Sequence, residues 1–248
     1  MKKTLQQILI FITLTLTLAS CAIKQDNGRD PFEKYNRNAY RANDKVDRWV
    51  LKPTAEGYDY VTPYFMRAGV SNFFDNLDTM PAFINDAAQG HAYWFFNDFW
   101  RFTINSTIGI AGLFDVASKM GLEKHKNGFG MTLAAWGAKD SPYIMLPIFG
   151  PNTLNSSFGI VFNYYSSPWY FLLNDPNWLP YGLYLFEGVN ERAMLLNEQS
   201  LFNGLALDPY VFMRSAYLQH RAYQLKINNT PPIPKHEDPR LIATDPEF

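Results

Sequence analysis

One stretch of the chain, AYWFFNDFWRFTINSTI at residues 92–108, places rings or aliphatic side chains on almost every side of the helix that it would form. A helix with so wide an apolar surface is buried in protein or in lipid. The chain must therefore give this segment apolar surroundings, and we expect a helix over residues 92–108. The side chains concerned are Tyr93, Trp94, Phe95, Phe96, Phe99, Trp100, Phe102 and Ile104.

A narrow polar line, made of Asn97, Asp98, Arg101 and Asn105, runs along this predicted helix. Asp98 and Arg101 stand three residues apart and can pair while the asparagines satisfy neighbouring backbone, which is the commoner state of buried polar groups. Because a charge that faces lipid is costly, the alternative is that Asn97, Arg101 and Asn105 line a wet passage or a lipid head-group site. The first role is favoured and the second stays open.

The chain is rich in rings, with 20 Phe, 15 Tyr and 6 Trp among 248 residues, and its net charge is −1. Rings favour cores, binding surfaces and membrane interfaces. Without the first twenty residues, which contain two lysines and no acid, the chain has 20 basic and 23 acidic side chains. This balance gives bulk charge no attraction for nucleic acid, so no nucleic-acid partner is expected.

The first twenty residues, MKKTLQQILIFITLTLTLAS, have the order of a secretory signal peptide: a cationic start, an apolar stretch and small residues at the end. The apolar stretch, residues 8–18, is shorter than the roughly 20 residues that span a bilayer. We therefore predict a cleaved signal peptide over residues 1–20.

Cys21 follows directly and is the only cysteine in the chain, so it has no intrachain disulfide partner. The sequence Leu18-Ala19-Ser20-Cys21 resembles the lipobox of bacterial lipoproteins, in which the cysteine thiol is acylated. Several acyl chains would anchor the protein essentially irreversibly. We predict lipid attachment at Cys21 and a lipidated tether over residues 21–29. Ala22 in place of aspartate resembles lipoproteins that are forwarded to the outer membrane.

Helical patterning begins at Asp30-Pro31, where Glu33 is placed for a capping box, and extends to just before Pro53. The segment 141–151 is broken by prolines and predicts a short hairpin or an extended loop. The region 30–227 has no internal repeat or linker, so we expect one all-α domain, followed by a disordered, proline-rich tail over 228–248. Further helices are expected from Pro63 to about Leu77 and over 81–90, 182–202 and 208–227.

Motifs for chemistry are absent from the sequence. The four histidines, His91, His125, His220 and His236, lack the spacing of metal ligands, so no metal site or cofactor is expected from sequence, although a composite metal site assembled in three dimensions stays open. The glycines at 109 and 112 suit close helix packing better than a phosphate cradle. A hydrolase triad of Ser141, Asp140 and His125 can be imagined only as a spatial arrangement.

Six stretches of the chain resemble, in the same order, those of the MlaA (VacJ) family of outer-membrane lipoproteins. Local departures are Ser141, where the family commonly has glycine, and PNTLNSSFG, which lacks a common Arg-Asp pair. The stretches are DPFEKYNRNAY, GVSNFFDNLDTMP, RFTINSTIGIAGLFDVA, FGMTLAAWGAKDSPYIMLPIFGP, EGVNERAMLLNE and DPYVFMRSAYLQ.

This resemblance implies a ring-shaped helical domain with a central amphipathic channel, lipid-anchored on the periplasmic side of the bacterial outer membrane. It implies removal of mislocalised phospholipids from the outer leaflet and their transfer to a soluble periplasmic carrier, association with a trimeric porin, and no enzymatic activity. The alternative is a lipid-anchored structural or adaptor protein that holds porins and moves no lipid.

Overall fold

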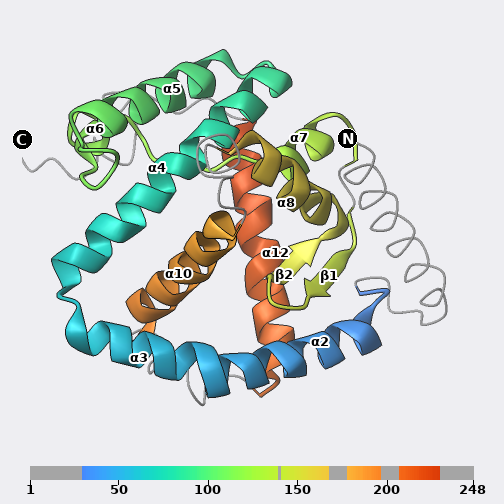
Figure 1. Cartoon of the computed structure of the whole chain (residues 1–248). Helices are drawn as coiled ribbons and strands as arrows, with labels where there is room; N and C mark the ends of the chain where they lie inside the picture. Colours follow the sequence, from blue (N-terminus) through green and yellow to red (C-terminus); the bar gives the residue numbers. More distant parts are fainter. Residues whose placement is uncertain (1–29, 139–140, 168–177, 197–206, 230–248) are drawn as a thin grey trace, which may run out of the picture.

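A computed structural model of the chain describes residues 30–138, 141–167, 178–196 and 207–229 (Figure 1). The predicted signal peptide, Cys21 and its tether lie outside these residues, as does nearly all of the predicted tail. The described elements are α2 (Glu33–Val46), the π-helix η1 (Asp47–Leu51), α3 (Lys52–Val61), α4 (Tyr64–Gln89), α5 (Ala92–Thr107), α6 (Val116–Lys119), α7 (Phe129–Ala135), β1 (Tyr143–Leu146), β2 (Gly150–Thr153), α8 (Leu154–Ser166), α10 (Leu179–Met194) and α12 (Pro209–Asn228).

The helices form a frame rather than a bundle (Figure 1). α2, η1 and α3 make its lower edge, α4 rises along one side and α5 runs across the top, while α10 and α12 lie inside this outline. The expectation of a mostly helical protein is confirmed, and the predicted hairpin is present as the antiparallel pair β1–β2, in which Tyr143 faces Thr153. α8, which directly follows β2, was not predicted from the sequence.

The first helix does not end before Pro53 as predicted. The π-helix η1 continues the chain from α2 into α3, and Pro53 lies in the first turn of α3. Within α3 the missing N–H of proline costs no hydrogen bond, because a first-turn N–H has no partner in its own helix, and its fixed φ suits the helix. The proline therefore starts a helix that follows the previous one without a break.

The predicted helices 63–77 and 81–90 are one helix, α4, with Pro81 inside it. The helix continues past this proline, and the Asn85 side chain donates a hydrogen bond to the Pro81 carbonyl at 2.8 Å. α4 ends where Gly90 adopts a left-handed conformation with φ 75°, which is a common helix C-terminus. The sequence therefore predicted the end of this helix correctly and its interior incorrectly.

Asp30 does not cap a helix as predicted, because α2 begins at Glu33 with Phe32 as its N-cap residue. The Asp30 carboxylate is instead buried, accepts hydrogen bonds from Asn36 at 2.9 Å and from the Tyr210 hydroxyl, and pairs with Arg214 at 3.0 Å. It therefore joins the start of α2 to α12, two elements that are far apart in the sequence.

Two asparagines of α2 hold the hairpin. Asn36 donates to the Tyr143 carbonyl at 3.2 Å and accepts from the Met145 N–H at 2.8 Å. Asn43 donates to the carbonyl of residue 146 at 2.9 Å and accepts from the N–H of residue 148 at 2.9 Å. Each asparagine uses both ends of its amide, so the hairpin is fixed in register against α2.

The last described helix, α12, begins as predicted. The Asp208 side chain accepts hydrogen bonds from the N–H groups of Tyr210 at 3.0 Å and Val211 at 3.2 Å, so it is the N-cap. The helix includes Asn228, whose side chain is buried, and the predicted tail therefore starts one residue too early.

Candidate functional site

α5 is turned so that its polar line faces the protein and many of its rings face outward. Asn97, Asp98, Arg101 and Asn105 are each at most 6% exposed. By contrast, about half of the surface of Tyr93, Phe96 and Trp100 is accessible: 50%, 58% and 51%. This is the reverse of a helix in a water-soluble protein, whose apolar stripe faces the core.

The whole described part of the chain shares this inversion. Apart from glycine and proline, its buried residues comprise sixteen polar or charged ones and only eleven apolar ones. Long apolar side chains are exposed instead, most clearly where η1, α3 and α4 follow one another: Trp49 is 83% exposed, Tyr60 91% and Phe65 73%. Exposed apolar surface on this scale marks a contact with a membrane or another protein. No helix of the described residues is both long and apolar enough to cross a bilayer.

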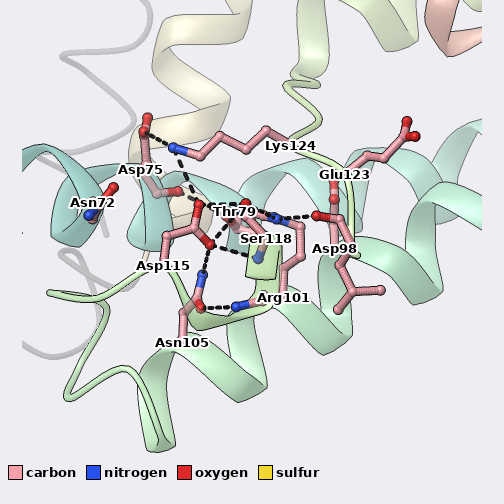
Figure 2. Close-up of polar contacts among 12 residues, drawn as sticks. Asn72, Asp75, Thr79, Asp98, Arg101, Asn105, Asp115, Ser118, Glu123 and Lys124 are labelled. Atoms are coloured by element: carbon pink, nitrogen blue, oxygen red, sulfur yellow. Dashed lines mark hydrogen bonds and ion pairs between the residues drawn. The ribbon is translucent and has the colours of Figure 1, made fainter. Parts of the chain in front are cut away.

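Arg101 and Asn105, two residues of the buried polar line, converge on the Asp115 carboxylate (Figure 2). Arg101 Nη2 donates to both carboxylate oxygens, at 3.1 and 3.2 Å, and Arg101 Nη1 donates to the Leu122 carbonyl at 2.7 Å. Ser118 donates its hydroxyl hydrogen to the same carboxylate at 2.6 Å. The predicted pair between Asp98 and Arg101 is not formed, because each of these side chains turns to a partner from the following segment.

The two asparagines of the line satisfy backbone groups, as the favoured interpretation expects. Asn105 accepts from the Ala117 N–H at 2.9 Å and donates to Asp115 at 3.1 Å. Asn97 donates to the Glu123 carbonyl at 2.9 Å. These contacts tie α5 to residues 115–123, which follow it in the chain, so the line has a clear structural role.

The Asp115 carboxyl is charged at neutral pH. Its partial burial opposes ionisation, but hydrogen bonds from Ser118, the charge of Arg101 and a hydrogen bond from Asn105 outweigh that effect and hold its pKa well below the usual range.

A small cavity of about 130 Å³ lies between α4, α5 and the segment after α6. Arg101 and Asn105 line it, whereas Asn97 does not belong to its lining. Asp75 on α4 faces the same cavity and pairs with Lys124 at 3.4 Å and Lys126 at 3.2 Å. Two of the three residues predicted to line a passage therefore reach a polar cavity, in addition to their structural contacts.

A second cavity of about 340 Å³ lies between α4 and α10. It shares Asp75 and Lys126 with the first cavity, so the two are neighbours. Its wall is amphipathic: Phe74 and Met194 are apolar, whereas Glu187 is acidic. A space with such a wall suits a molecule that has a polar head and apolar tails.

Carboxylates gather around these cavities. The pKa of Glu187 is raised to about 8, mainly by burial and to a smaller extent by repulsion from the charges of Asp78 and Glu191. Burial also raises the pKa of Asp78 to about 6, although the positive charge of Lys126 opposes the shift. The Asp78 side chain nevertheless retains accessible surface. Asp78 is therefore surrounded by protein and still reached by solvent, as expected of a residue on a concave surface. This agrees with its place in the lining of the first cavity.

The glycines at 109 and 112 permit close packing, as predicted. Gly112 has φ 92°, and a Cβ built there would lie 2.6 Å from the Asn76 Cβ on α4. Asn76 in turn donates to the Ser106 hydroxyl at 2.9 Å, which joins α4 to α5. The loop after α5 can therefore approach α4 only without a side chain at this position.

The imagined hydrolase triad is not assembled by the described residues. His125 directs its two ring nitrogens to Asp98 at 2.8 Å and Asn228 at 2.5 Å. The Ser141 hydroxyl accepts a hydrogen bond from the Asn155 N–H at 2.8 Å. Asp140 lies outside the described residues. The imidazole and the serine therefore serve different local structures.

A family model described as "MlaA lipoprotein" matches residues 28–224 of the chain. The chain belongs to the MlaA lipoprotein family. The resemblance inferred from the six sequence stretches is thereby confirmed.

Three relatives from other bacteria are similar over most of the chain. The intermembrane phospholipid transport system lipoprotein MlaA of Escherichia coli K12 is 31% identical over 250 residues, which cover 98% of this chain and 96% of that protein. The protein of the same name from Haemophilus influenzae is 33% identical over 233 residues, 90% of each chain. An uncharacterised protein of Rickettsia felis is 36% identical over 200 residues, 80% of this chain and 78% of that one.

The fold is also similar to a solved structure, described as "Structural basis for maintenance of bacterial outer membrane lipid asymmetry". The TM-score is 0.68 at 32% sequence identity, and the match covers 79% of this chain and 98% of the other. The family and its helical fold are therefore supported by sequence and by structure.

Sequence reasoning missed most of the cavity wall. Asp75, Asp78 and Asp115 stand in segments that were read as helix or loop, and Glu187 stands in a predicted helix of mixed character. The one available signal was their position inside stretches that resemble the family. Cys21, the predicted site of lipid attachment, lies outside the described residues and stays a prediction.

Proposed function

We propose that this chain is an outer-membrane lipoprotein that takes mislocalised phospholipids from the outer leaflet and passes them to a soluble periplasmic lipid carrier. The names of the Escherichia coli and Haemophilus influenzae relatives and the subject of the similar solved structure support this function. We further propose that the chain is held on the periplasmic side by lipid on Cys21, works beside a trimeric porin and has no catalytic role.

The inversion of α5 is the observation that best supports the proposal. Exposed rings such as Phe96 and Trp100 suit acyl chains, whereas buried polar groups and the charged cavities next to them suit a lipid head group. A body that lies within the membrane surface needs no spanning helix if its outer face is apolar in this way. The charged walls then offer the head group a polar route that the bilayer lacks.

The proposed mechanism is passive. The head group contacts polar wall residues such as Asp78 and Arg101, while Phe74 and Met194 accommodate acyl chains. The sequence contains no P-loop, so we infer that the direction of transfer is set by the affinity of the downstream carrier.

The function is tested by expression of the chain in an Escherichia coli strain that lacks its own relative. Phospholipid in the outer leaflet is reported by the acylation of lipid A in the outer membrane. We expect the chain to return lipid A acylation to the wild-type level, and a Cys21→Ser variant, which should also lose metabolic labelling with palmitate, to fail.

The alternative, an adaptor that holds porins and moves no lipid, predicts a different result. It would leave lipid A acylation high although the chain is present in the outer membrane and is recovered with the porin. Removal of the gene from its native host separates the same two functions: unchanged outer-leaflet phospholipid would contradict transport.

The proposed lack of catalysis has its own assay. Purified protein incubated with phospholipid should release neither lysophospholipid nor fatty acid. Release that disappears in the Ser141→Ala variant would contradict this part of the proposal and would favour a hydrolase.

A further inference from the structure

We propose that Asp86, Asp98 and His125 bind a divalent transition-metal ion, with zinc as the best match. The three side chains come from α4, from α5 and from the segment after α6, and all three are buried. Each can offer one ligand atom, and these atoms all lie within 4.8 Å of one another. The binding of a metal ion by these residues does not depend on the proposed lipid transfer and is tested independently of it.

The hydrogen bonds of His125 indicate which ring nitrogen is free for a metal. Asn228 directs its side-chain NH₂ to the Met131 sulfur at 2.9 Å, so its oxygen faces the imidazole. His125 Nε2 must then carry a hydrogen and donate it to Asn228. In the neutral ring the lone pair of Nδ1 is left pointing at two carboxylates, which is unfavourable unless a proton or a metal ion lies between them.

Each carboxylate has one oxygen held by an asparagine and the other turned toward His125. Asp98 Oδ1 accepts from Asn97 at 2.8 Å, and Asp86 Oδ1 accepts from Asn127 at 2.6 Å. Partners that orient ligating side chains in this way are usual around bound metals. The remaining oxygens, both Oδ2, lie 2.8 Å (Asp98) and 3.7 Å (Asp86) from His125 Nδ1.

A hydrogen on Nδ1 would satisfy only one of these two oxygens. At 2.8 Å it reaches Asp98, but Asp86 Oδ2 is too distant for a hydrogen bond. Asp86 Oδ2 is fully buried and, in the ionised carboxylate, accepts no hydrogen bond from the described residues. A buried oxygen without a partner is costly, and one metal ion would satisfy both carboxylates and the imidazole together.

Charge also favours a divalent ion. No ion pair of the described residues joins Asp86 or Asp98 to a lysine or an arginine. Two carboxylates and one neutral imidazole carry a charge of −2, which a divalent cation cancels. One nitrogen and two oxygen ligands suit zinc, which binds histidine and aspartate, whereas calcium and magnesium prefer oxygen alone.

The ion would act as a staple between elements that frame the first cavity. It would join α4, α5 and the segment of His125, and the hydrogen bond from His125 to Asn228 would extend the connection to α12. The imidazole is further fixed by stacking on Trp94, with ring centroids 4.1 Å apart and an interplanar angle of 10°. His125 also lines the cavity, so the ion would hold part of its wall in place.

The proposal is tested on the full chain purified in detergent. The protein is stripped with a chelator, dialysed against zinc or manganese, and its metal content is measured by mass spectrometry of the elements. We expect about one ion per chain in the wild type and a loss of at least tenfold in Asp86→Asn and in His125→Gln. Asp44→Asn, which changes an aspartate on the surface of α2, is the matched control and should keep its metal.

Thermal unfolding distinguishes a bound metal ion from a proton that is shared within the cluster. A metal should raise the Tm of the wild type by about 5 °C or more relative to the chelated protein and should leave the Tm of Asp86→Asn unchanged. If the cluster instead holds a proton, Asp86→Asn imitates the neutral acid and melts no lower than the wild type. Wild-type protein with no bound ion and the same Tm in zinc and in chelator would overturn the proposal even if neither variant folds.

Discussion

Arg101 Nη2 lies 3.1 and 3.2 Å from the two carboxylate oxygens of Asp115, and this pair is the centre of the polar contacts beneath α5. The Arg101 side chain is 7% exposed and that of Asp115 15%. The pair explains how a helix covered with rings can place a charged residue on its inner side without leaving that charge unpaired.

Replacement of Arg101 by leucine should destabilise the fold. It leaves the partly buried Asp115 carboxylate with only the more exposed Lys124, at 3.5 Å, as a cation, and the loss of the buried partner costs about 3 kcal/mol. We expect a lower free energy of unfolding in detergent and less protein in the membrane. Arg48→Leu is the control, because the Arg48 side chain is 69% exposed and, within the part of the chain that the structure describes, its one ion pair is with Asp44; it should change stability by less than about 0.5 kcal/mol. Normal abundance of Arg101→Leu with lost transport would instead assign Arg101 to the passage alone.

Acid should weaken the same contacts. Because the folded protein holds the pKa of Asp115 below its ordinary value near 4, the carboxylate stabilises the fold above that value, and this contribution is lost as pH falls through the lower folded pKa. The Tm should therefore fall on acidification below about pH 5, and the fall should be smaller in Asp115→Asn. A variant that tracks the wild-type curve at a constant offset would contradict this assignment.

A rise in pH should lower the stability of the fold through ionisation of Glu187. Its folded pKa is about 8, above the ordinary value near 4.3, so the folded state favours the protonated acid. That preference stabilises the fold fully below the ordinary pKa, and the stabilisation is lost as pH rises to about 8. Glu187→Gln should therefore lose less stability than the wild type between pH 6 and 9. Glu56→Gln, on the exposed side of α3, should behave like the wild type.

Gly112 and Gly121 offer a matched pair for the packing of the loop after α5. Both have positive φ, 92° and 90°, but a Cβ at Gly121 meets nothing within 4 Å, whereas one at Gly112 meets Asn76 at 2.6 Å. Gly121→Ala should cost about 1 kcal/mol from backbone strain alone. Gly112→Ala should cost more, measured by denaturant unfolding, because α4 and the loop must also move apart. Equal costs for the two variants would contradict a tight contact at Gly112.

The sequence predicted the features that local chemistry determines. The wide apolar surface of 92–108, the Asp208 cap and the hairpin near Tyr143 all follow from spacing and turn residues, and the structure confirms them. The interior of α4 was missed because Pro81 breaks the local pattern, although the helix continues past it in the folded protein. The role of Asp30 was missed because its partner Arg214 is 184 residues away.

Only part of the candidate site could be predicted from the sequence, because many of its residues are distant from one another in the chain. The polar line of α5 could be read from its spacing, but its partner Asp115 and the cavity residues Asp75 and Glu187 come together only through packing. The cluster of Asp86, Asp98 and His125 is likewise assembled from three segments without any ligand spacing in the chain.

Capture of lipid inside the second cavity tests the proposed passage most directly. A photoreactive amino acid in place of Met194, on the apolar part of the wall, is activated by light in living cells, and the adduct is identified by mass spectrometry. The same amino acid in place of Asp44, on the surface of α2, is the control. Passage of phospholipid predicts a phospholipid adduct at position 194 and little or none at 44. If the variant with the photoreactive residue at position 194 reaches the outer membrane and restores lipid asymmetry but gives no lipid adduct, that result would contradict passage through this cavity.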